Sequence, residues 1–387
     1  METDGRILID ARPALDPRRT GVGHYALQLI RHLPPADPET AYVAWYLHAR
    51  GLLRPRRFFA GVAPNLEEHA SRFPARVFQP LSWRAQLPRI EWLAGTFDRL
   101  IATNFLPPAT ARIERCVLVV HDLAFDRFPA TAPHVDRRWR RRFSEALAGC
   151  AAVIVPSASA RDDLLAAHGV EPSRVHVVHH GVDAHEFRPS PAQEVERVKR
   201  AFRIEGPYAL FVGGIEPRKN LDGLVRAFAS VPPPASLVLA GGPVRWDSAA
   251  AERLDREISA LPDHVRARIV RTGYVSEGDK GALLTGATVL AYPSKYEGFG
   301  FPVLEGFAAG VPVLTSDVSS LPEVAGDAAV LVDPNDEGAI GAELTRLFAD
   351  EDLRHVLRAA GHARVARFTW EATARATAQV LHGVRAG

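Results

Sequence analysis

The chain has 387 residues, of which 47% are hydrophobic and 24% are charged, and its formal net charge at pH 7 is +2. This length exceeds what one hydrophobic core usually supports, so we expect two domains. The small net charge makes no case for nucleic acid as a partner. The only two cysteines, Cys116 and Cys150, stand in apolar runs, which argues against a disulfide framework and against a cysteine metal site.

The first ten residues lack the basic and apolar regions of a signal peptide. No apolar run approaches the roughly 20 residues that a membrane-spanning helix needs. We therefore expect a cytoplasmic protein, and a peripheral contact with the inner face of the membrane stays open.

Short β-branched or aliphatic runs alternate with helix-length segments in the first half of the chain, at 6–10, 42–46, 117–121, 152–156 and 175–179. A second series follows Pro189, at 208–212, 236–240, 269–272, 289–292, 313–315 and 329–332. This alternation predicts an α/β protein with two doubly wound, Rossmann-like domains. Residues 183–191 carry two prolines without apolar periodicity and fit a linker. Ligands of such sheets bind beyond the carboxyl ends of the strands.

Two loops of the first half are candidates for such binding. Gly21, Val22 and Gly23 match a dinucleotide fingerprint, but residues 11–20 separate them from the preceding strand, which weakens that interpretation. The alternatives are a plain helix N-terminus or a loop whose backbone approaches phosphates. His121 ends an apolar strand and is either a sugar contact or a satisfied structural histidine. Ser157 is placed to cap a helix.

In the second half, a strand ends in Gly213 and Gly214, and Arg218 and Lys219 follow in the same loop. Such cations neutralise a diphosphate, although adjacent basic residues are more often a solvated surface. Tyr274 and Val275 follow another strand and would form a shelf for a nucleotide base.

Two carboxylates, Glu297 and Glu305, flank a glycine-containing turn between a buried strand and a helix closed by Gly310. Carboxylates accept paired hydrogen bonds from vicinal hydroxyls, and a helix N-terminus binds phosphate. One glutamate would then hold a hexose and the other a ribose, with the diphosphate between them. The ordinary alternative is two solvated glutamates on a helical turn.

The string E-G-F-G-F-P-V-L-E-G-F-A-A-G-V-P-V at 297–313 resembles the donor-binding segment of glycosyltransferase family 4. The resemblance implies the GT-B fold, in which two Rossmann-like domains face each other across a cleft. Residues 1–185 would bind the acceptor and residues 186–370 the nucleotide-sugar donor, and a helix at 371–387 would return to the first domain. The implied catalytic residues are His121, Arg218, Lys219 and Glu297. The implied donor-binding residues are Gly21, Val22, Gly23, Gly213, Gly214, Tyr274, Val275, Phe299, Gly300, Phe301, Val303, Leu304 and Glu305.

The resemblance further implies a retaining hexosyltransferase that acts on a saccharide, glycolipid or small-molecule acceptor. The string Glu-Pro-Arg-Lys-Asn at 216–220 is similar to a sub-branch with many mannosyltransferases, which favours GDP-mannose and leaves UDP- and dTDP-sugars open. The family more often has an arginine where Gly214 stands, and Arg218 would supply the missing charge.

We expect no metal and no cofactor, because the single Asp-x-Asp match, at 350–352, begins a predicted surface helix far from any strand-end loop. Cationic clusters with aromatic residues at 54–59 and 137–143 would contact anionic lipid or a lipid diphosphate, or form a solvated face with Trp139 in the core. Other hypotheses are a sugar-nucleotide epimerase, an NAD-linked oxidoreductase and a non-catalytic sugar-nucleotide binder.

Overall fold

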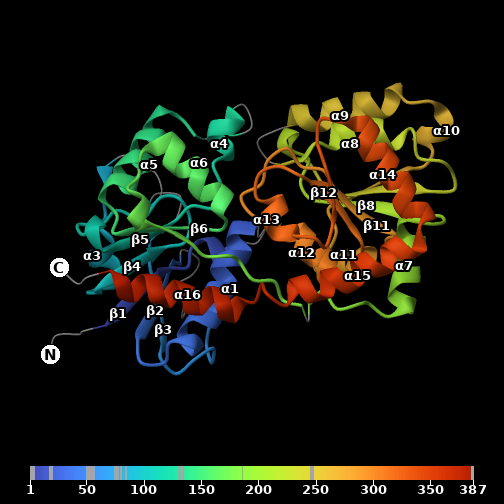
Figure 1. Ribbon diagram of the computed structural model, residues 1–387. Coiled ribbons are helices and arrows are strands. Elements are labelled where there is room, and N and C mark those ends of the chain that lie inside the picture. The colour runs from blue at the N-terminus through green and yellow to red at the C-terminus, as the bar shows by residue number, and fades with distance from the viewer. Residues whose placement is uncertain are drawn as a thin grey trace. The chain divides into compact units, whose positions relative to one another are not determined.

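The computed structural model describes residues 5–16, 21–48, 57–73, 78, 81–82, 85–129, 132, 135–184, 186–244 and 248–384 (Figure 1). The chain divides into two compact units. Unit 1 contains Met1–Leu123, His134–Gly181 and Trp370–Gly387, and unit 2 contains Ala124–Pro133 and Val182–Thr369. The short segment Ala124–Pro133 therefore belongs with unit 2, although it lies within the range 1–185 that we assigned to the first domain.

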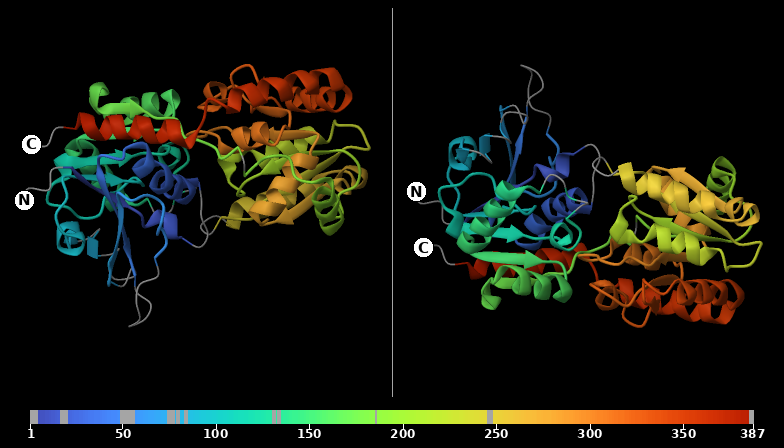
Figure 2. Two further views of the ribbon diagram at one scale, coloured as in Figure 1. Left: turned by 90° about the horizontal axis from the view of Figure 1, so that it is seen from below. Right: turned by 90° about the horizontal axis from the view of Figure 1, so that it is seen from above.

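Unit 1 contains a seven-stranded parallel sheet in the order β3-β2-β1-β4-β5-β6-β7. Its strands are β1 (Arg6–Asp10), β2 (Ala41–Leu47), β3 (Leu66–Ser71), β4 (Arg99–Ala102), β5 (Cys116–Val119), β6 (Ala152–Val155) and β7 (Val175–Val177). Its α-helices are α1 (Gly21–Ala36), α3 (Ile90–Ala94), α5 (Arg137–Gly149), α6 (Ala158–His168) and α16 (Trp370–Gly383). Helices α1 and α16 come from opposite ends of the chain and pack against each other (Figure 2).

Unit 2 contains a six-stranded parallel sheet in the order β10-β9-β8-β11-β12-β13. Its strands are β8 (Tyr208–Val212), β9 (Ser236–Ala240), β10 (Ile269–Gly273), β11 (Val289–Tyr292), β12 (Val313–Ser316) and β13 (Val330–Val332). Its helices are α4 (Ala124–Arg127), α7 (Ala192–Phe202), α8 (Leu221–Phe228), α9 (Ser248–Ala260), α10 (Asp263–Arg266), α11 (Glu277–Gly286), α12 (Phe301–Ala308), α13 (Leu321–Ala325), α14 (Glu337–Ala349) and α15 (Glu351–Val365). Helix α8 packs with α9 and α14 on one side of the sheet, whereas α7 packs with α11 and α12 with α15 on the other (Figure 1).

The predicted α/β class with two parallel sheets is confirmed. Strands β8, β9, β11 and β12 are buried along their whole length, which is why apolar residues dominate their sequences. Strands β3 and β4 were not predicted. Strand β3 lies at the sheet edge and has the polar sequence LEEHAS.

The helix-end signals were interpreted correctly. The Ser157 hydroxyl accepts the Ala160 N–H at the start of α6. Gly310 follows α12 with a left-handed φ of 71°. Because every strand pair is parallel, the loops after the strands of each sheet gather at one edge, where binding sites of such sheets lie.

Candidate functional site

Glycines follow three neighbouring strands of unit 2 and connect the strand ends. The Gly213 N–H donates to the Ala240 carbonyl and the Gly241 N–H to the Gly273 carbonyl, each at 2.9 Å. Gly241 has φ of 147°, and a Cβ at this position would lie 1.8 Å from the Gly213 carbonyl oxygen. Only glycine fits there, so the backbone at this edge stays open to a ligand. Gly241 was not predicted as a site residue, although it also directly follows a strand.

Lys219 lies beside these glycines. A Cβ at Gly213, where φ is 151°, would lie 2.7 Å from the Lys219 Nζ, so the absence of a side chain makes room for the ammonium group. The Lys219 side chain is 12% exposed, and its Nζ lies 3.9 Å from the Glu216 Oε1. The turn is anchored by the buried Asn220, whose Nδ2 donates to two backbone carbonyls of other loops. A cation is thus held at the end of β8.

Arg218 bridges two carboxylates. Its Nη1 donates to the Glu297 Oε2 at 2.6 Å, and its Nε donates to the Glu216 Oε2 at 3.0 Å. The Arg218 and Glu297 side chains are 12% and 11% exposed. This geometry shows that Arg218 holds Glu297 in place, a role that the sequence did not reveal. The charge that we predicted for a diphosphate is therefore largely balanced within the protein.

Glu297 is held as an anion. Its other oxygen, Oε1, accepts the hydroxyl proton of Tyr292 at 2.6 Å. Burial by itself would raise the pKa of Glu297, but the charges of Arg218 and Lys219 and the Tyr292 hydrogen bond outweigh it and lower the pKa. Each carboxylate oxygen has a second lone pair, so Glu297 can still accept hydrogen bonds from hydroxyl groups of a ligand.

Two serines fix the backbone of the Glu297 loop. The Ser319 Oγ accepts the Glu297 N–H at 3.1 Å and donates to the Glu297 carbonyl at 2.6 Å. The Ser320 Oγ lies 2.8 Å from the carbonyls of both Glu297 and Phe299. These serines were missed at the sequence level, because a serine pair after a strand is not distinctive until the loop that it contacts is known.

Helix α12 follows this loop directly. Gly300 precedes it with a φ of 113°, Pro302 has no N–H, and the Val303 N–H already bonds the Gly300 carbonyl at 3.1 Å. The helix terminus therefore offers fewer N–H groups to an anion than an ordinary helix start. Lys219 would consequently have to provide more of the positive charge that neutralises a bound phosphate.

The other predicted residues of this segment differ in their surroundings. Val303 and Leu304 are fully buried, and Phe299 is buried with its ring 5.6 Å from that of Phe301. Neither Val303 nor Leu304 thus exposes a side chain to a ligand. Glu305 is placed by the second turn of α12, and its Oε1 accepts a hydrogen bond from the Lys280 Nζ at 3.0 Å.

Tyr274 and Val275 follow β10 at the same edge of the sheet. Tyr274 is 84% exposed, whereas Val275 packs partly against the hydrophobic core. Gly214 follows Gly213, and a Cβ there would lie 2.9 Å from the Val244 Cγ1. The exposed ring of Tyr274 is therefore available to a ligand at the end of β10.

His121, in unit 1, is a buried and neutral ring. Its Nε2 donates to the Thr103 carbonyl at 2.9 Å, because a carbonyl can only accept, and its Nδ1 lies 3.5 Å from the His180 Nε2. Burial lowers the pKa of His121 to about 4. The ring of Tyr25 packs edge-on against it at 5.0 Å. The imidazole is therefore uncharged at neutral pH. Its hydrogen bond to Thr103 and its packing against Tyr25 are those of a satisfied structural histidine.

Gly21, Val22 and Gly23 belong to helix α1 and not to a loop. Of the two alternatives for these residues, the glycine-rich loop is wrong and the plain helix N-terminus is confirmed, because their backbone is helical. The same helix carries Tyr25, which contacts His121, so α1 and the end of β5 meet within unit 1.

The arginines of α5 form a basic surface, but its aromatic residues do not contribute to it. Trp139 is buried and stacks on Phe143 with ring centroids 5.2 Å apart. Arg137, Arg138 and Arg141 are exposed. In the other basic cluster, 54–56 lie outside the described residues, Arg57 and Phe58 are exposed, and Phe59 is buried.

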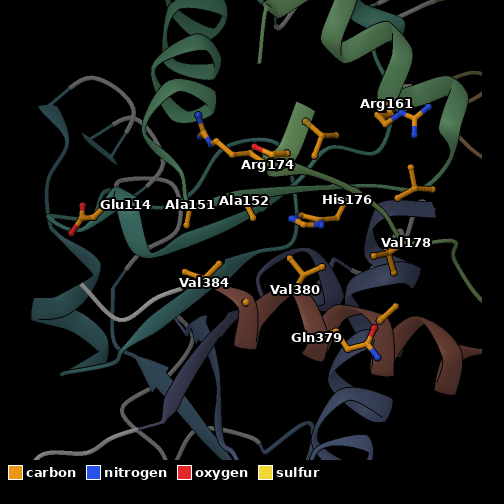
Figure 3. A pocket seen from close by; sticks show the side chains of 15 residues that line it. Glu114, Ala151, Ala152, Arg161, Arg174, His176, Val178, Gln379, Val380 and Val384 are labelled. Atoms are coloured by element: carbon orange, nitrogen blue, oxygen red, sulfur yellow. The ribbon is translucent and has the colours of Figure 1, made fainter. Parts of the chain in front are cut away.

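A cavity of about 750 Å³ lies in unit 1 between the sheet edge at β7 and helix α16 (Figure 3). Val178 and His176 line it from the sheet side, and Gln379 and Val380 line it from α16. None of the predicted site residues borders this cavity.

Among the described residues, no group of three or more histidine, cysteine, aspartate or glutamate side chains could hold a metal ion. The part of the chain that the structure describes contains no helix that is both long and apolar enough to span a membrane.

Comparison with known proteins assigns both halves of the chain. Residues 19–186 match the family described as Glycosyltransferase Family 4, and residues 192–364 match Glycosyl transferases group 1. O-antigen chain mannosyltransferase B from Escherichia coli is 30% identical over 91% of this chain and 93% of its own. A D-inositol 3-phosphate glycosyltransferase from Xylanimonas cellulosilytica is 30% identical over 75% of this chain and 69% of its own.

Among solved structures, HepE from Anabaena in complex with UDP and glucose superimposes with a TM-score of 0.71 at 15% identity, covering 98% of this chain and 100% of its own. At that identity the likeness shows the fold alone. The relatives named here are transferases, which speaks against the oxidoreductase, the epimerase and the non-catalytic binder. The chain belongs to glycosyltransferase family 4, has the GT-B fold and is a hexosyltransferase.

Proposed function

We propose that this enzyme transfers mannose from GDP-mannose to a saccharide-bearing acceptor, with retention of the anomeric configuration and without a metal ion. The observation that carries the proposal is the buried pair of Arg218 and Glu297 beside Lys219, because it places a hydroxyl-accepting anion next to a cation. Mannose as the donor sugar is supported by the relative named O-antigen chain mannosyltransferase B, which matches along nearly the whole chain.

Different residues of unit 2 bind different parts of the donor. Lys219 neutralises the diphosphate, and Gly213 lets the backbone approach it. Glu297 accepts hydrogen bonds from hexose hydroxyls with its remaining lone pairs, and Glu305 accepts those of the ribose. The exposed ring of Tyr274 supports the base.

The chemical step breaks the bond between the anomeric carbon and the β-phosphate oxygen, and the departing GDP takes the electron pair. The acceptor oxygen forms the new bond on the same face of the sugar, and its proton passes to the leaving phosphate. Preorganised positive charge near the β-phosphate lowers this barrier. Lys219 supplies that charge, while Arg218 keeps Glu297 oriented. His121 is neutral and does not exchange a proton in this step, since its two nitrogens face the Thr103 carbonyl and His180 within unit 1.

Two side chains of the acidic triplet at 350–352, those of Asp350 and Glu351, have structural partners, which supports the proposed metal independence. Asp350 caps α15 by accepting the Leu353 N–H at 2.8 Å. Glu351 pairs with Arg354 and Arg358. A carboxylate engaged in this way is poorly placed to bind a substrate metal.

The acceptor is proposed to be a saccharide or a lipid-linked saccharide, approached through peripheral contact with anionic lipid at the inner face of the membrane. The exposed Arg137, Arg138 and Arg141 support electrostatic attachment, whereas the buried Trp139 argues against insertion of an aromatic side chain. Replacing the three arginines by serine should abolish sedimentation with phosphatidylglycerol vesicles at low salt. Equal sedimentation of wild type and variant would reject the lipid contact.

The donor is tested by thermal shift and turnover with GDP-mannose, UDP-glucose, UDP-N-acetylglucosamine and dTDP-rhamnose, each with and without EDTA. We expect stabilisation and turnover with GDP-mannose only, unchanged by EDTA, and an axial C1 linkage in the product by NMR. Turnover with a UDP- or dTDP-sugar instead would refute GDP-mannose, and loss of activity in EDTA that Mg²⁺ restores would refute metal independence.

A further inference from the structure

Lys280, on helix α11, makes a buried bridge to Glu305. Its Nζ lies 3.0 Å from the Glu305 Oε1 and 2.7 Å from the Glu277 Oε2. The Lys280 and Glu305 side chains are 14% and 13% exposed, whereas Glu277 is 62% exposed. The ammonium also lies 4.6 Å from the ring centroid of Phe187. Lys280 thus connects the linker, α11 and α12 within unit 2.

The Lys280 ammonium group stays charged and interacts with groups of the protein itself. Burial alone would lower the pKa of Lys280, but Glu305 and Glu277 outweigh burial and raise it. Two of its three N–H groups meet carboxylates, and the Phe187 ring faces the cation. Lys280 is therefore suited to hold Glu305 in one orientation and not to contact a ligand itself.

We infer that Lys280 is a positioning residue that makes the donor site select ribonucleoside diphosphate sugars over their 2′-deoxy counterparts. This inference rests on the proposed function, in which Glu305 binds the ribose. Because Lys280 fixes the Oε1 of Glu305, the Oε2 keeps a fixed direction and can accept a vicinal hydroxyl pair with good geometry. A 2′-deoxyribose lacks one of those hydroxyls and forfeits a charge-assisted hydrogen bond.

The test compares the affinities of GDP and 2′-deoxy-GDP, and of UDP and 2′-deoxy-UDP, by titration calorimetry. Wild type should prefer the ribonucleotide of the accepted base by about tenfold or more, the value of one hydrogen bond to a charged group. In Lys280→Met the preference should fall to within about threefold, because the freed carboxylate no longer keeps its direction. Lys280→Arg should restore it. Lys199→Met is the matched control, since Lys199 also pairs with a glutamate, at 3.6 Å, but on a helix surface.

A merely structural lysine would lower both affinities equally and leave their ratio unchanged, and that outcome overturns the inference. Wild-type binding of GDP or UDP without a preference over the deoxy form also overturns it, while the proposed function stands. Absence of binding to any nucleoside diphosphate overturns both. A stability cycle of Lys280→Met, Glu305→Gln and the double variant, without ligand, shows whether the pair forms: additive effects would remove its structural basis.

Discussion

Replacing Arg218 by methionine should destabilise unit 2 at neutral pH, because Glu297 is left charged without its cation. The two side chains are 12% and 11% exposed and lie 2.6 Å apart. Removing one partner of such a buried pair costs about 3–5 kcal/mol. Arg197 is the matched control, since it also bridges two carboxylates, Glu194 at 2.7 Å and Asp279 at 2.6 Å, but is 49% exposed. Its replacement by methionine should cost far less stability than the replacement of Arg218, because solvent screens an exposed ion pair.

The loss should depend on pH in a defined direction. The folded pKa of Glu297 lies below its usual value, so this carboxyl stabilises the fold above its unfolded pKa and the benefit is lost as pH falls through the folded pKa. Without Arg218, burial is opposed only by Lys219 and the Tyr292 hydroxyl, and because burial is the largest influence on Glu297 we expect its pKa to rise. The variant should then lose stability as pH rises through the ordinary carboxyl range near about 4. The difference in unfolding free energy between wild type and variant should therefore be largest at neutral pH and should disappear in acid.

Scanning calorimetry between acid and neutral pH measures this difference, because the two units can unfold in separate transitions. The double variant Arg218→Met/Glu297→Gln should recover part of the lost stability, since it removes the unpaired charge. A neutral-pH loss below about 1 kcal/mol, or a loss that does not change with pH, would refute the reasoning.

Other substitutions test the remaining parts of the site. Lys219→Ala should lower kcat by about 10²–10³-fold through lost charge stabilisation, with little loss of stability, and unchanged kinetics would remove Lys219 from the site. Gly241→Ala should abolish nucleotide-dependent thermal stabilisation, because its Cβ would lie 1.8 Å from a carbonyl oxygen; a wild-type thermal shift would contradict this. Because the pKa of His121 is lowered to about 4, the folded state should lose about 3 kcal/mol as pH falls from 6.5 to 4, and His121→Gln should flatten that part of the stability profile.

The sequence alone was enough to predict the two sheets and most of their strands, because a strand buried on both faces must be an apolar run that turn residues interrupt. It failed for β3, whose polar sequence reflects a place at the sheet edge. It could not decide between a loop and a helix N-terminus for Gly21–Gly23, which the structure places in a helix. Local patterns do not report which neighbour covers a segment.

The sequence also determined the residue types of the site, since glycines, cations and carboxylates after strands are local signals. Only the tertiary structure decided which of these residues pair with each other and which face a ligand. Arg218 and Glu297 are far apart in the chain, and the sequence could not show that the arginine balances a carboxylate and leaves Lys219 as the cation nearest the glycines. The bridge from Lys280 to Glu305 was likewise invisible, because a hydrogen bond depends on where two helices pack and not on the spacing of residues along the chain.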